Sequence, residues 1–413
     1  MNFIETPTTK EILRLIDCEA KRQEFEIELI ASENYVSKNI LTANGSILTN
    51  KYSEGYPGKR YYAGQVNIDQ IENIAIDLAK EVFGAEYANV QPLSGSPANM
   101  MVYSAILKPG DKVLALSLDH GGHLTHGHPL SESGRLYSFD FYIVDPVTER
   151  IDMESVRQKA LEFKPKLIVA GFSAYSRSLD WKAFRAIADE VGALLMADMA
   201  HIAGLVAGKV LENPVPYCDV VTTTTHKTLR GPRGALIMSK EKYAKDLARA
   251  VFPGMQGGPH DHITAAKAIA LAEALTPEFQ AYCVQVIKNA QALSEELSVL
   301  GVRIVSGGTD NHLLCMDVAN SYDLGGKKAE LVLEQIGIST NKNMIPFDPR
   351  KPLDPSGVRL GTPAVTTRGM WVPEMKTLAH IIDKALRNPD DVTGLAALHT
   401  EVVNLCKKFP IYV

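Results

Sequence analysis

Two charged residues of this chain stand where ionised side chains are uncommon. Lys227 follows four threonines and a histidine, so its neighbours are small and uncharged. An amine in such surroundings is desolvated, its pKa falls, and it can attack a carbonyl group to form a Schiff base. Asp198 directly follows the apolar run 193–197, and a buried carboxylate needs a cation or several hydrogen-bond donors. The simpler alternatives are a solvated surface lysine and an aspartate that caps the next helix.

A lysine and a carboxylate of this kind are what pyridoxal phosphate enzymes use. The lysine carries the cofactor, and the carboxylate keeps the cofactor ring protonated so that it can accept electrons. The segment 94–99, SGSPAN, precedes an apolar helical stretch, and we predict Ser96 as the N-cap and Pro97 as the first helical residue. Backbone N–H groups at such an N-terminus bind phosphate, although a capped helix without a ligand gives the same pattern.

Three further groups could take part in chemistry. Four histidines lie between residues 120 and 128, and no carboxylate or thiolate has matching metal-ligand spacing. We therefore expect no metal, and a histidine ring that stacks on a planar cofactor. The loop 50–62 holds four tyrosines and Glu54 between glycine and proline breaks, which is typical of a site-forming loop or of a plain surface loop. Arg359 follows a glycine turn and suits bidentate capture of a carboxylate, unless it is an ordinary surface arginine.

These residues are positioned by alternating strands and helices. Apolar runs predict strands at 112–117, 167–170, 193–197, 219–222 and 234–238, with helices at 151–163 and 181–191. The pattern predicts an α/β fold with a mostly parallel central sheet, in which at least one strand runs antiparallel because Val221 and Ala235 are close in sequence. Ligands bind beyond the carboxyl ends of such strands. Four consecutive strand ends are followed by His, Ser, Asp with His, and Lys, which favours one shared site.

The pattern changes after residue 276. A long helix at 278–300 leads to strands at 302–305 and 313–317 and helices at 327–336 and 375–385, which together indicate a smaller α+β domain. An amphipathic helix is predicted at 8–22. We therefore expect an N-terminal helical arm (1–22), a large domain (23–275) and a small C-terminal domain (276–413).

Composition excludes several classes of protein. The 413 residues are 46% hydrophobic and 22% charged, with a net charge of −5, which disfavours binding of nucleic acid. Five scattered cysteines without a CxxC pair indicate a reducing compartment. No apolar run approaches the ~20 residues that span a bilayer, and no signal-peptide pattern is evident. We expect a cytoplasmic enzyme that does not bind a membrane.

Taken together, these motifs resemble the serine hydroxymethyltransferases, pyridoxal phosphate enzymes of the aspartate aminotransferase fold (fold type I). The resemblance runs from LIASENY at 29–35, through 50–62, 120–127, 198–201, 222–234 and 252–259, to VRLGTP at 358–363. It implies reversible transfer of the hydroxymethyl carbon of L-serine to tetrahydrofolate, giving glycine and 5,10-methylenetetrahydrofolate through a PLP external aldimine. It also implies a homodimer with shared active sites, and leaves a tetramer open.

The resemblance implies a role for each matched residue in holding the cofactor. Pyridoxal 5'-phosphate would be bound covalently to Lys227, with Asp198 at its ring nitrogen and His123 and Ala200 on its two faces. Ser173 and His201 would lie near its phenolic oxygen. The phosphate would be held by Gly95 and Ser96, together with Tyr52 and Gly258 of the partner subunit.

The resemblance also implies the substrate contacts. Arg359, Ser32 and Tyr62 would hold the serine carboxylate. Glu54 would be the acid/base group near the serine hydroxyl and the folate. The pterin would contact Leu118, Gly122 and Asn343, and Thr224 would join Tyr62 and His201 among the catalytic residues.

The residues alone leave other functions open. An aldolase for β-hydroxy amino acids would keep Lys227, Asp198 and Arg359 without needing folate contacts, and a binding protein without activity would keep the fold. A nicotinamide oxidoreductase is disfavoured, because no G-x-G-x-x-G motif follows any predicted strand.

Overall fold

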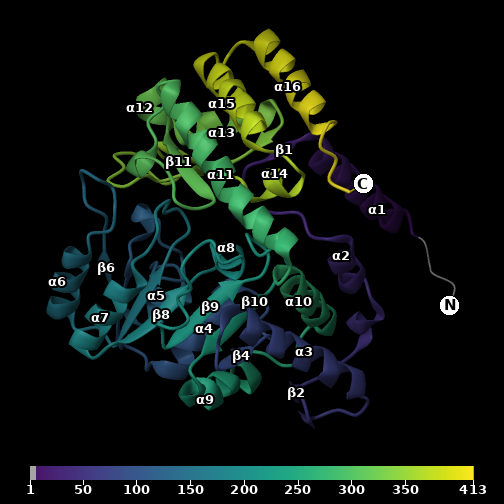
Figure 1. Cartoon of the computed structure of the whole chain (residues 1–413), viewed down its shortest axis with the longest axis vertical. Coiled ribbons are helices and arrows are strands. Elements are labelled where there is room, and N and C mark those ends of the chain that lie inside the picture. Colours follow the sequence, from purple (N-terminus) through teal and green to yellow (C-terminus); the bar gives the residue numbers. More distant parts are fainter. Residues whose placement is uncertain (1–5, 413) are drawn as a thin grey trace.

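The computed structural model of the chain describes residues 6–412 and is built around a seven-stranded sheet (Figure 1). The strand order is β4-β10-β9-β8-β7-β5-β6. β10 pairs antiparallel with both neighbours, and the other pairs are parallel, which confirms the mostly parallel sheet with an antiparallel member. The strands are β4 (Tyr87–Asn89), β5 (Lys112–Leu116), β6 (Ser138–Tyr142), β7 (Leu167–Gly171), β8 (Leu194–Asp198), β9 (Val220–Thr224) and β10 (Ala235–Ser239).

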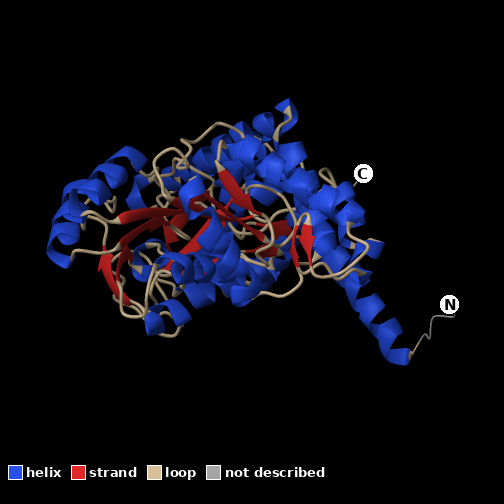
Figure 2. Cartoon of the chain, turned by 90° about the horizontal axis from the view of Figure 1, so that it is seen from below, coloured by secondary structure: helices blue, strands red, loops and turns tan. Residues whose placement is uncertain are grey.

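Helices cover both faces of this sheet (Figure 2). Every residue of β7 is buried; Ile168 and Ala170 pack into the core on one face, and Leu167 and Val169 into the core on the other. This two-sided burial explains why the strands are continuous apolar runs. The helices of this part are α2 (Lys38–Asn44), α3 (Val66–Phe83), α4 (Gly95–Ile106), α5 (Glu132–Leu136), α6 (Met153–Phe163), α7 (Trp181–Val191), α8 (Ala203–Ala207), α9 (Ala244–Arg249) and α10 (Asp261–Ala274).

The C-terminal part has its own apolar core beside a three-stranded antiparallel sheet of order β11-β14-β13. Its strands are β11 (Leu313–Asp317), β13 (Asn341–Asn343) and β14 (Gly357–Gly361), and β12 (Ile338–Ser339) pairs with β1 (Ile27–Glu28). Its helices are α11 (Pro277–Val299), α12 (Val318–Tyr322), α13 (Gly326–Gln335), α14 (Pro363–Thr367), α15 (Val372–Arg387) and α16 (Val392–Cys406). The division into domains at residues 22 and 275 stays a prediction.

The predicted strand at 302–305 is wrong. Only Ile304 forms an isolated bridge, to Met316, and a short 3₁₀ turn η5 (Val305–Gly307) follows. Ser306 and Gly307 have φ angles of 58° and 71°, so the chain turns left-handed where a strand would have to continue. Val302 and Ile304 are apolar because they pack into the C-terminal core.

The predicted elements omit three long helices, α3, α10 and α16. α10 is buried along most of its length and rich in alanine, so it has no distinct apolar stripe for a periodicity argument to detect. The helix predicted at 8–22 forms α1 (Pro7–Phe25), which has no buried residue and extends away from the rest of the chain (Figure 2), whereas residues 1–5 of the predicted arm lie outside the described residues. Among the described residues, no helix combines the length and the apolar character needed to cross a membrane.

Candidate active site

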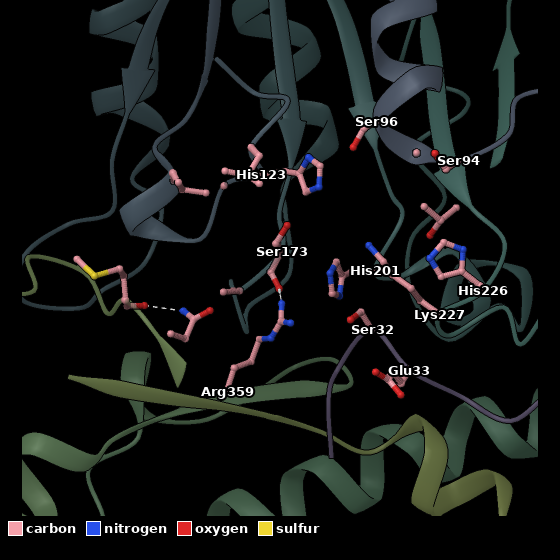
Figure 3. A pocket seen from close by; sticks show the side chains of 18 of the residues that line it. Ser32, Glu33, Ser94, Ser96, His123, Ser173, His201, His226, Lys227 and Arg359 are labelled. Carbon is pink, nitrogen blue, oxygen red and sulfur yellow. Dashed lines mark hydrogen bonds between the residues drawn. The ribbon is translucent and has the colours of Figure 1, made fainter. Parts of the chain in front are cut away.

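The carboxyl ends of four parallel strands open into one cavity of about 670 Å³ (Figure 3). Residues that follow β5, β7, β8 and β9 line it, together with the N-terminus of α4, the segment after β1 and strand β14. This arrangement is the one expected for an open α/β sheet. The predicted site residues that line the cavity are Ser32, Gly95, Ser96, Leu118, Gly122, His123, Ser173, His201, Thr224, Lys227, Asn343 and Arg359.

Lys227 reaches the cavity from the turn after β9, and its side chain is buried. Burial, together with the positive charges of Arg359 and Arg233, lowers the pKa of Lys227 to about 8, against the opposing attraction of Asp198. A substantial fraction of this amine is therefore neutral near pH 8 and able to attack a carbonyl carbon.

Asp198 ends β8 at the base of the site and does not itself line the cavity. Its carboxylate accepts hydrogen bonds from Asn99 Nδ2 (2.8 Å) and from the backbone N–H of Ala200 (3.1 Å), and lies 3.1 Å from His126 Nε2. Burial alone would favour the neutral acid, but hydrogen bonding and charge from His126, with Asn99, hold the pKa of Asp198 well below its usual range. The site thus contains a permanent carboxylate that can face a cationic ring.

The fold brings a carboxylate, that of Asp198, next to the histidine cluster, although Asp198 is far from these histidines in the sequence. His123, His126 and Asp198 each place one ligand atom within 4.8 Å of the others. Asp198 Oδ2 already accepts from Asn99 and faces His126, so these contacts account for the cluster without an ion. The absence of a metal stays a prediction.

Two imidazoles face the cavity as neutral groups. Burial and the neighbouring His126 lower the pKa of His123 to about 4, and its Nδ1 lies 2.8 Å from Thr125 Oγ1. Burial likewise lowers the pKa of His201 far below its usual value. His201 Nδ1 lies 3.1 Å from Nε2 of the fully buried His312, a partner that the sequence analysis missed because it follows no strand of the central sheet.

Arg359 projects from β14 across the cavity toward the loop after β7 (Figure 3). Its Nε donates to Asn341 Oδ1 (3.0 Å) and its Nη1 to the carbonyl oxygen of Ser173 (2.6 Å). Within residues 6–412 it forms no ion pair with a carboxylate. A buried guanidinium without an acidic partner is well suited to bind the carboxylate of a ligand.

The helix start at the phosphate-binding segment differs from the prediction. α4 begins at Gly95 with Ser94 as its N-cap, so neither Ser96 as N-cap nor Pro97 as first helical residue is correct. The backbone is extended at Ser94 (φ −164°, ψ 172°) and helical from Gly95, which lies close to β9: a Cβ atom there would be 2.7 Å from Thr224 Cγ2. Ser94 and Ser96 still face the cavity from this N-terminus (Figure 3).

The remaining predicted residues lie outside this cavity. Ala200 is buried behind Asp198, to which its N–H donates. Tyr52, Glu54, Tyr62 and Gly258 form a separate group on the surface of the described chain. Tyr52 Oη lies 3.2 Å from Glu54 Oε1, its ring packs edge-on against Tyr62 at 5.1 Å, and it also approaches Gly258.

Several cavity residues escaped the sequence analysis. Charged side chains Glu33, Arg233 and Lys342 line it, as does His226, whose pKa burial lowers to about 3. His226 and Arg233 lie in the 222–234 motif with Lys227, and Glu33 lies in the 29–35 motif, so these three carry a signal in the sequence, whereas Lys342 lies in none of the quoted motifs.

Comparison with known proteins is decisive for the family. A sequence model described as serine hydroxymethyltransferase matches residues 6–382. A serine hydroxymethyltransferase of Desulfotalea psychrophila is 58% identical over 400 residues, which cover 97% of this chain and 94% of that one. One of Mycoplasma mycoides is 57% identical over 412 residues, covering 100% and 99%.

The chain belongs to the serine hydroxymethyltransferase family.

Membership of the serine hydroxymethyltransferase family confirms the predicted enzyme class and the aspartate aminotransferase fold. The reaction transfers the hydroxymethyl carbon of serine to tetrahydrofolate, and the family depends on pyridoxal phosphate. The cavity suits that cofactor in three ways: a buried amine of lowered pKa, a permanent carboxylate at its base, and a helix N-terminus without a Cβ at Gly95. An oxidoreductase or a binding protein without activity no longer needs to be considered.

Proposed function

We propose that the cavity around Lys227 is the active site for transfer of the serine hydroxymethyl carbon to tetrahydrofolate. The observation that carries this assignment is the convergence of Lys227, Asp198 and Arg359 around one cavity: a buried amine, and a carboxylate and an unpaired guanidinium that are each partly buried. When bound, pyridoxal phosphate supplies an electron sink that allows the Cα–Cβ bond of serine to break.

In this proposal Lys227 would hold the cofactor covalently, and the carboxylate of Asp198 would accept a hydrogen bond from the protonated ring nitrogen. His123, which lines the cavity, would pack on one face of the ring; Ala200, which does not line the cavity, is assigned to the other face as the family resemblance implies. The low pKa of His123 supports this role, because a neutral imidazole stacks beside Lys227 without adding a second positive charge.

The phosphate is held at the N-terminus of α4 by Gly95 and Ser96. Free N–H groups and the positive end of the helix dipole favour an anion there. Ser173 and His201 lie on the opposite side of the cavity, near Arg359 (Figure 3), and are assigned to the phenolic oxygen and the substrate.

Arg359 and Ser32 hold the carboxylate of serine. The guanidinium uses one N–H for Asn341 and one for Ser173, so it keeps N–H donors for a carboxylate in the cavity that it lines. Tyr62 completes this contact from a second subunit, as described below.

Tetrahydrofolate is assigned to the outer part of the cavity. Leu118, Gly122 and Asn343 line it there, with Met344 and two prolines beside them. Asn343 Nδ2 donates to the carbonyl oxygen of Met344 (2.6 Å), which leaves its amide oxygen able to accept from the pterin.

Proton transfer is assigned to Glu54, with His201 and Thr224 nearby in the cavity. Glu54 manages the proton of the serine hydroxyl as the carbon is transferred to folate. A side chain must lie within hydrogen-bond reach of the proton it moves. Since Glu54, Tyr52, Tyr62 and Gly258 do not line the cavity of their own chain, we assign them to the site of a second copy.

The surface around Glu54 fits a homodimer. Exposed apolar side chains gather on the elements that surround it: Ile47, Tyr61, Val66, Ile74 and Met255. These elements, η1 (Ile47–Asn50), the β2–β3 hairpin (Gly55–Tyr56 and Lys59–Arg60), α3 and the turn 250–255, belong to one side of the chain (Figure 1). Exposed apolar side chains on neighbouring elements support the proposal that this part of the chain contacts a second copy.

Two measurements on the purified protein test the proposed function. Borohydride reduction followed by peptide mass analysis should find the cofactor on Lys227. Folate-dependent conversion of serine to glycine should be lost in Lys227→Ala. Cofactor found on another lysine, or serine turnover that persists in the variant, would contradict the assignment. Turnover that is independent of folate would instead favour the aldolase.

A further inference from the structure

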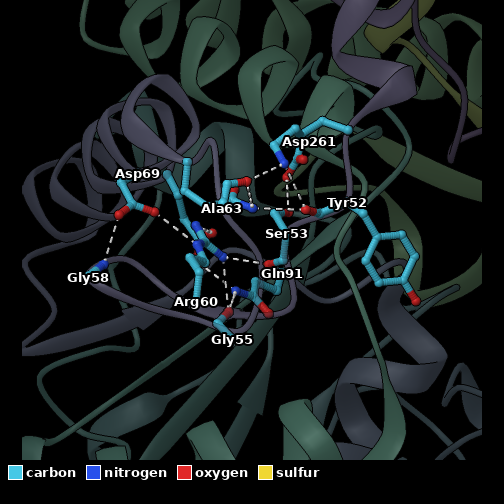
Figure 4. A network of polar contacts seen from close by, with 12 residues as sticks. Tyr52, Ser53, Gly55, Gly58, Arg60, Ala63, Asp69, Gln91 and Asp261 are labelled. Carbon is cyan, nitrogen blue, oxygen red and sulfur yellow. Dashed lines mark hydrogen bonds and ion pairs between the residues drawn. The ribbon is translucent and has the colours of Figure 1, made fainter.

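The loop that carries Glu54 is organised around one buried guanidinium, that of Arg60 (Figure 4). The Arg60 side chain is only 3% exposed. Its Nη1 donates to the carbonyl oxygens of Ser53 (2.8 Å) and Gly55 (3.0 Å), the two residues that flank Glu54. The carbonyl oxygen of Glu54 itself accepts from the backbone N–H of Tyr61 (3.1 Å). The backbone of Glu54 is therefore held on both sides.

The same guanidinium is fixed to a long helix. Its Nε donates to Asp69 Oδ1 (2.9 Å) and its Nη2 to Glu72 Oε2 (2.6 Å), both on α3. Gln91 also links the loop to α3, because its Nε2 donates to the carbonyl oxygen of Gly55 (2.9 Å) in the loop and to Glu72 Oε1 (2.7 Å) on the helix. Arg60 thus holds the backbone of the loop in a fixed position relative to α3.

The side chain of Glu54 has little fixation of its own. Its carboxylate accepts from the hydroxyl of Tyr52, at 3.2 Å, and lies beside Gly257, and both neighbours are exposed. The position of the Glu54 carboxylate therefore depends mainly on the position of the Glu54 backbone. A lysine could not replace the arginine here, since one ammonium group cannot reach two carboxylates and two carbonyl oxygens in a single plane.

We propose that Arg60 is a positioning residue for the reaction, which presets the backbone of the 52–62 loop so that Glu54 meets the serine hydroxyl in the neighbouring site. This inference rests on the proposed role of Glu54. It assigns Arg60 no contact with substrate or cofactor.

A double-mutant cycle with Glu54→Gln tests this proposal. Arg60→Met should lower kcat/KM for folate-dependent serine cleavage by about 100-fold, the typical cost of misplacing a reacting group by about 1 Å. In a Glu54→Gln background the same substitution should cost less than about threefold, because the group that Arg60 positions is already disabled. A purely structural arginine would lower the rate by the same factor in both backgrounds, and that result would overturn the proposal.

The matched control is Arg185→Met. Arg185 also bridges two carboxylates, those of Asp189 and Asp219, each at 2.8 Å, and donates to a backbone carbonyl oxygen, but it lies on α7 outside the cavity. Its substitution should leave kcat/KM within about threefold of the parent protein. Arg185 is 19% exposed, more than Arg60. A loss in the control equal to that of Arg60→Met would show a general effect of removing an arginine that bridges two carboxylates.

A second readout needs neither cofactor nor turnover. Hydrogen exchange of the cofactor-free protein should accelerate in peptides that cover residues 52–62 in Arg60→Met, and not in peptides from α7. If Arg60→Met does not fold because Glu72 is left buried and unpaired, Arg60→Met with Glu72→Gln removes both charges and is carried through the same cycle. Unchanged exchange in the 52–62 loop contradicts the proposal. Normal serine kinetics of the Glu54→Gln protein alone would instead contradict the proposed role of Glu54, on which the proposal for Arg60 rests.

Discussion

Substitution of Arg359 by methionine should separate ligand binding from stability. Methionine keeps most of the volume and removes the charge. A guanidinium has five N–H donors, of which one on Nε and one on Nη1 are used by Asn341 and Ser173. Three remain, enough for a bidentate carboxylate contact inside the cavity. Loss of such a desolvated contact costs roughly 2–5 kcal/mol, so the dissociation constant for glycine should rise roughly 30- to 4,000-fold at 1.4 kcal/mol per factor of ten.

The free energy of unfolding should change much less than the free energy of glycine binding in Arg359→Met. The buried cation has no carboxylate partner among the described residues, so its removal relieves a desolvation penalty that offsets the two lost hydrogen bonds. The free energy of unfolding of the cofactor-free protein should change by less than about 2 kcal/mol. Denaturant titration of the parent and variant measures this change.

The binding assay compares glycine with glycinamide, which lacks the carboxylate, by the absorbance change of the bound cofactor. The parent protein should prefer glycine strongly, and Arg359→Met should bind both ligands about equally. Arg359→Lys is the control that restores charge without the planar fork, and should recover part of the preference. A preference for glycine that survives in the methionine variant would mean that the carboxylate binds elsewhere.

Three further predictions concern the cofactor and the proton. Covalent uptake of pyridoxal phosphate should accelerate as pH rises and level off above about 8, because only the neutral form of Lys227 attacks; a plateau reached only near pH 10 in stopped-flow absorbance would contradict its lowered pKa. Asp198→Asn places an amide where Asn99 donates, and should weaken cofactor binding by about 3–5 kcal/mol in equilibrium dialysis; unchanged affinity would reduce Asp198 to a helix cap. Glu54→Gln should leave cofactor affinity intact while folate-dependent serine cleavage slows about 100-fold or more; parental kinetics would exclude Glu54 from the mechanism.

The sequence predicts the site residues that follow the parallel strands, because the order of strands fixes where their carboxyl ends lie. Once 112–117, 167–170, 193–197 and 219–222 are recognised as buried strands, their carboxyl ends must meet at one edge of the sheet, and His123, Ser173, His201 and Lys227 do line one cavity. The glycine turn before Arg359 suggests a carboxylate-binding residue, but strand order could not place it in this site, because it comes from a different sheet in the C-terminal part.

Contacts that depend on packing between distant segments could not be predicted. Nothing in the sequence pairs His312 with His201 across 111 residues, or places Asn99 against Asp198. Likewise, Arg60 is one cation in a polar loop, and its burial follows from how α3 and the β2–β3 hairpin pack. The close approach of Gly95, where α4 begins, to Thr224 of β9 is also a contact between segments far apart in the sequence.

The central claim is that each active site combines Lys227 of one chain with Glu54 of another. Lys227→Ala and Glu54→Gln proteins should each be nearly inactive alone. After equal mixing and verified subunit exchange, half of the dimers are mixed, and each mixed dimer contains one site with neither substitution. Folate-dependent serine cleavage should therefore recover to about a quarter of the parental activity. No recovery despite complete exchange would show that Glu54 and Lys227 act within one chain, and would contradict the account.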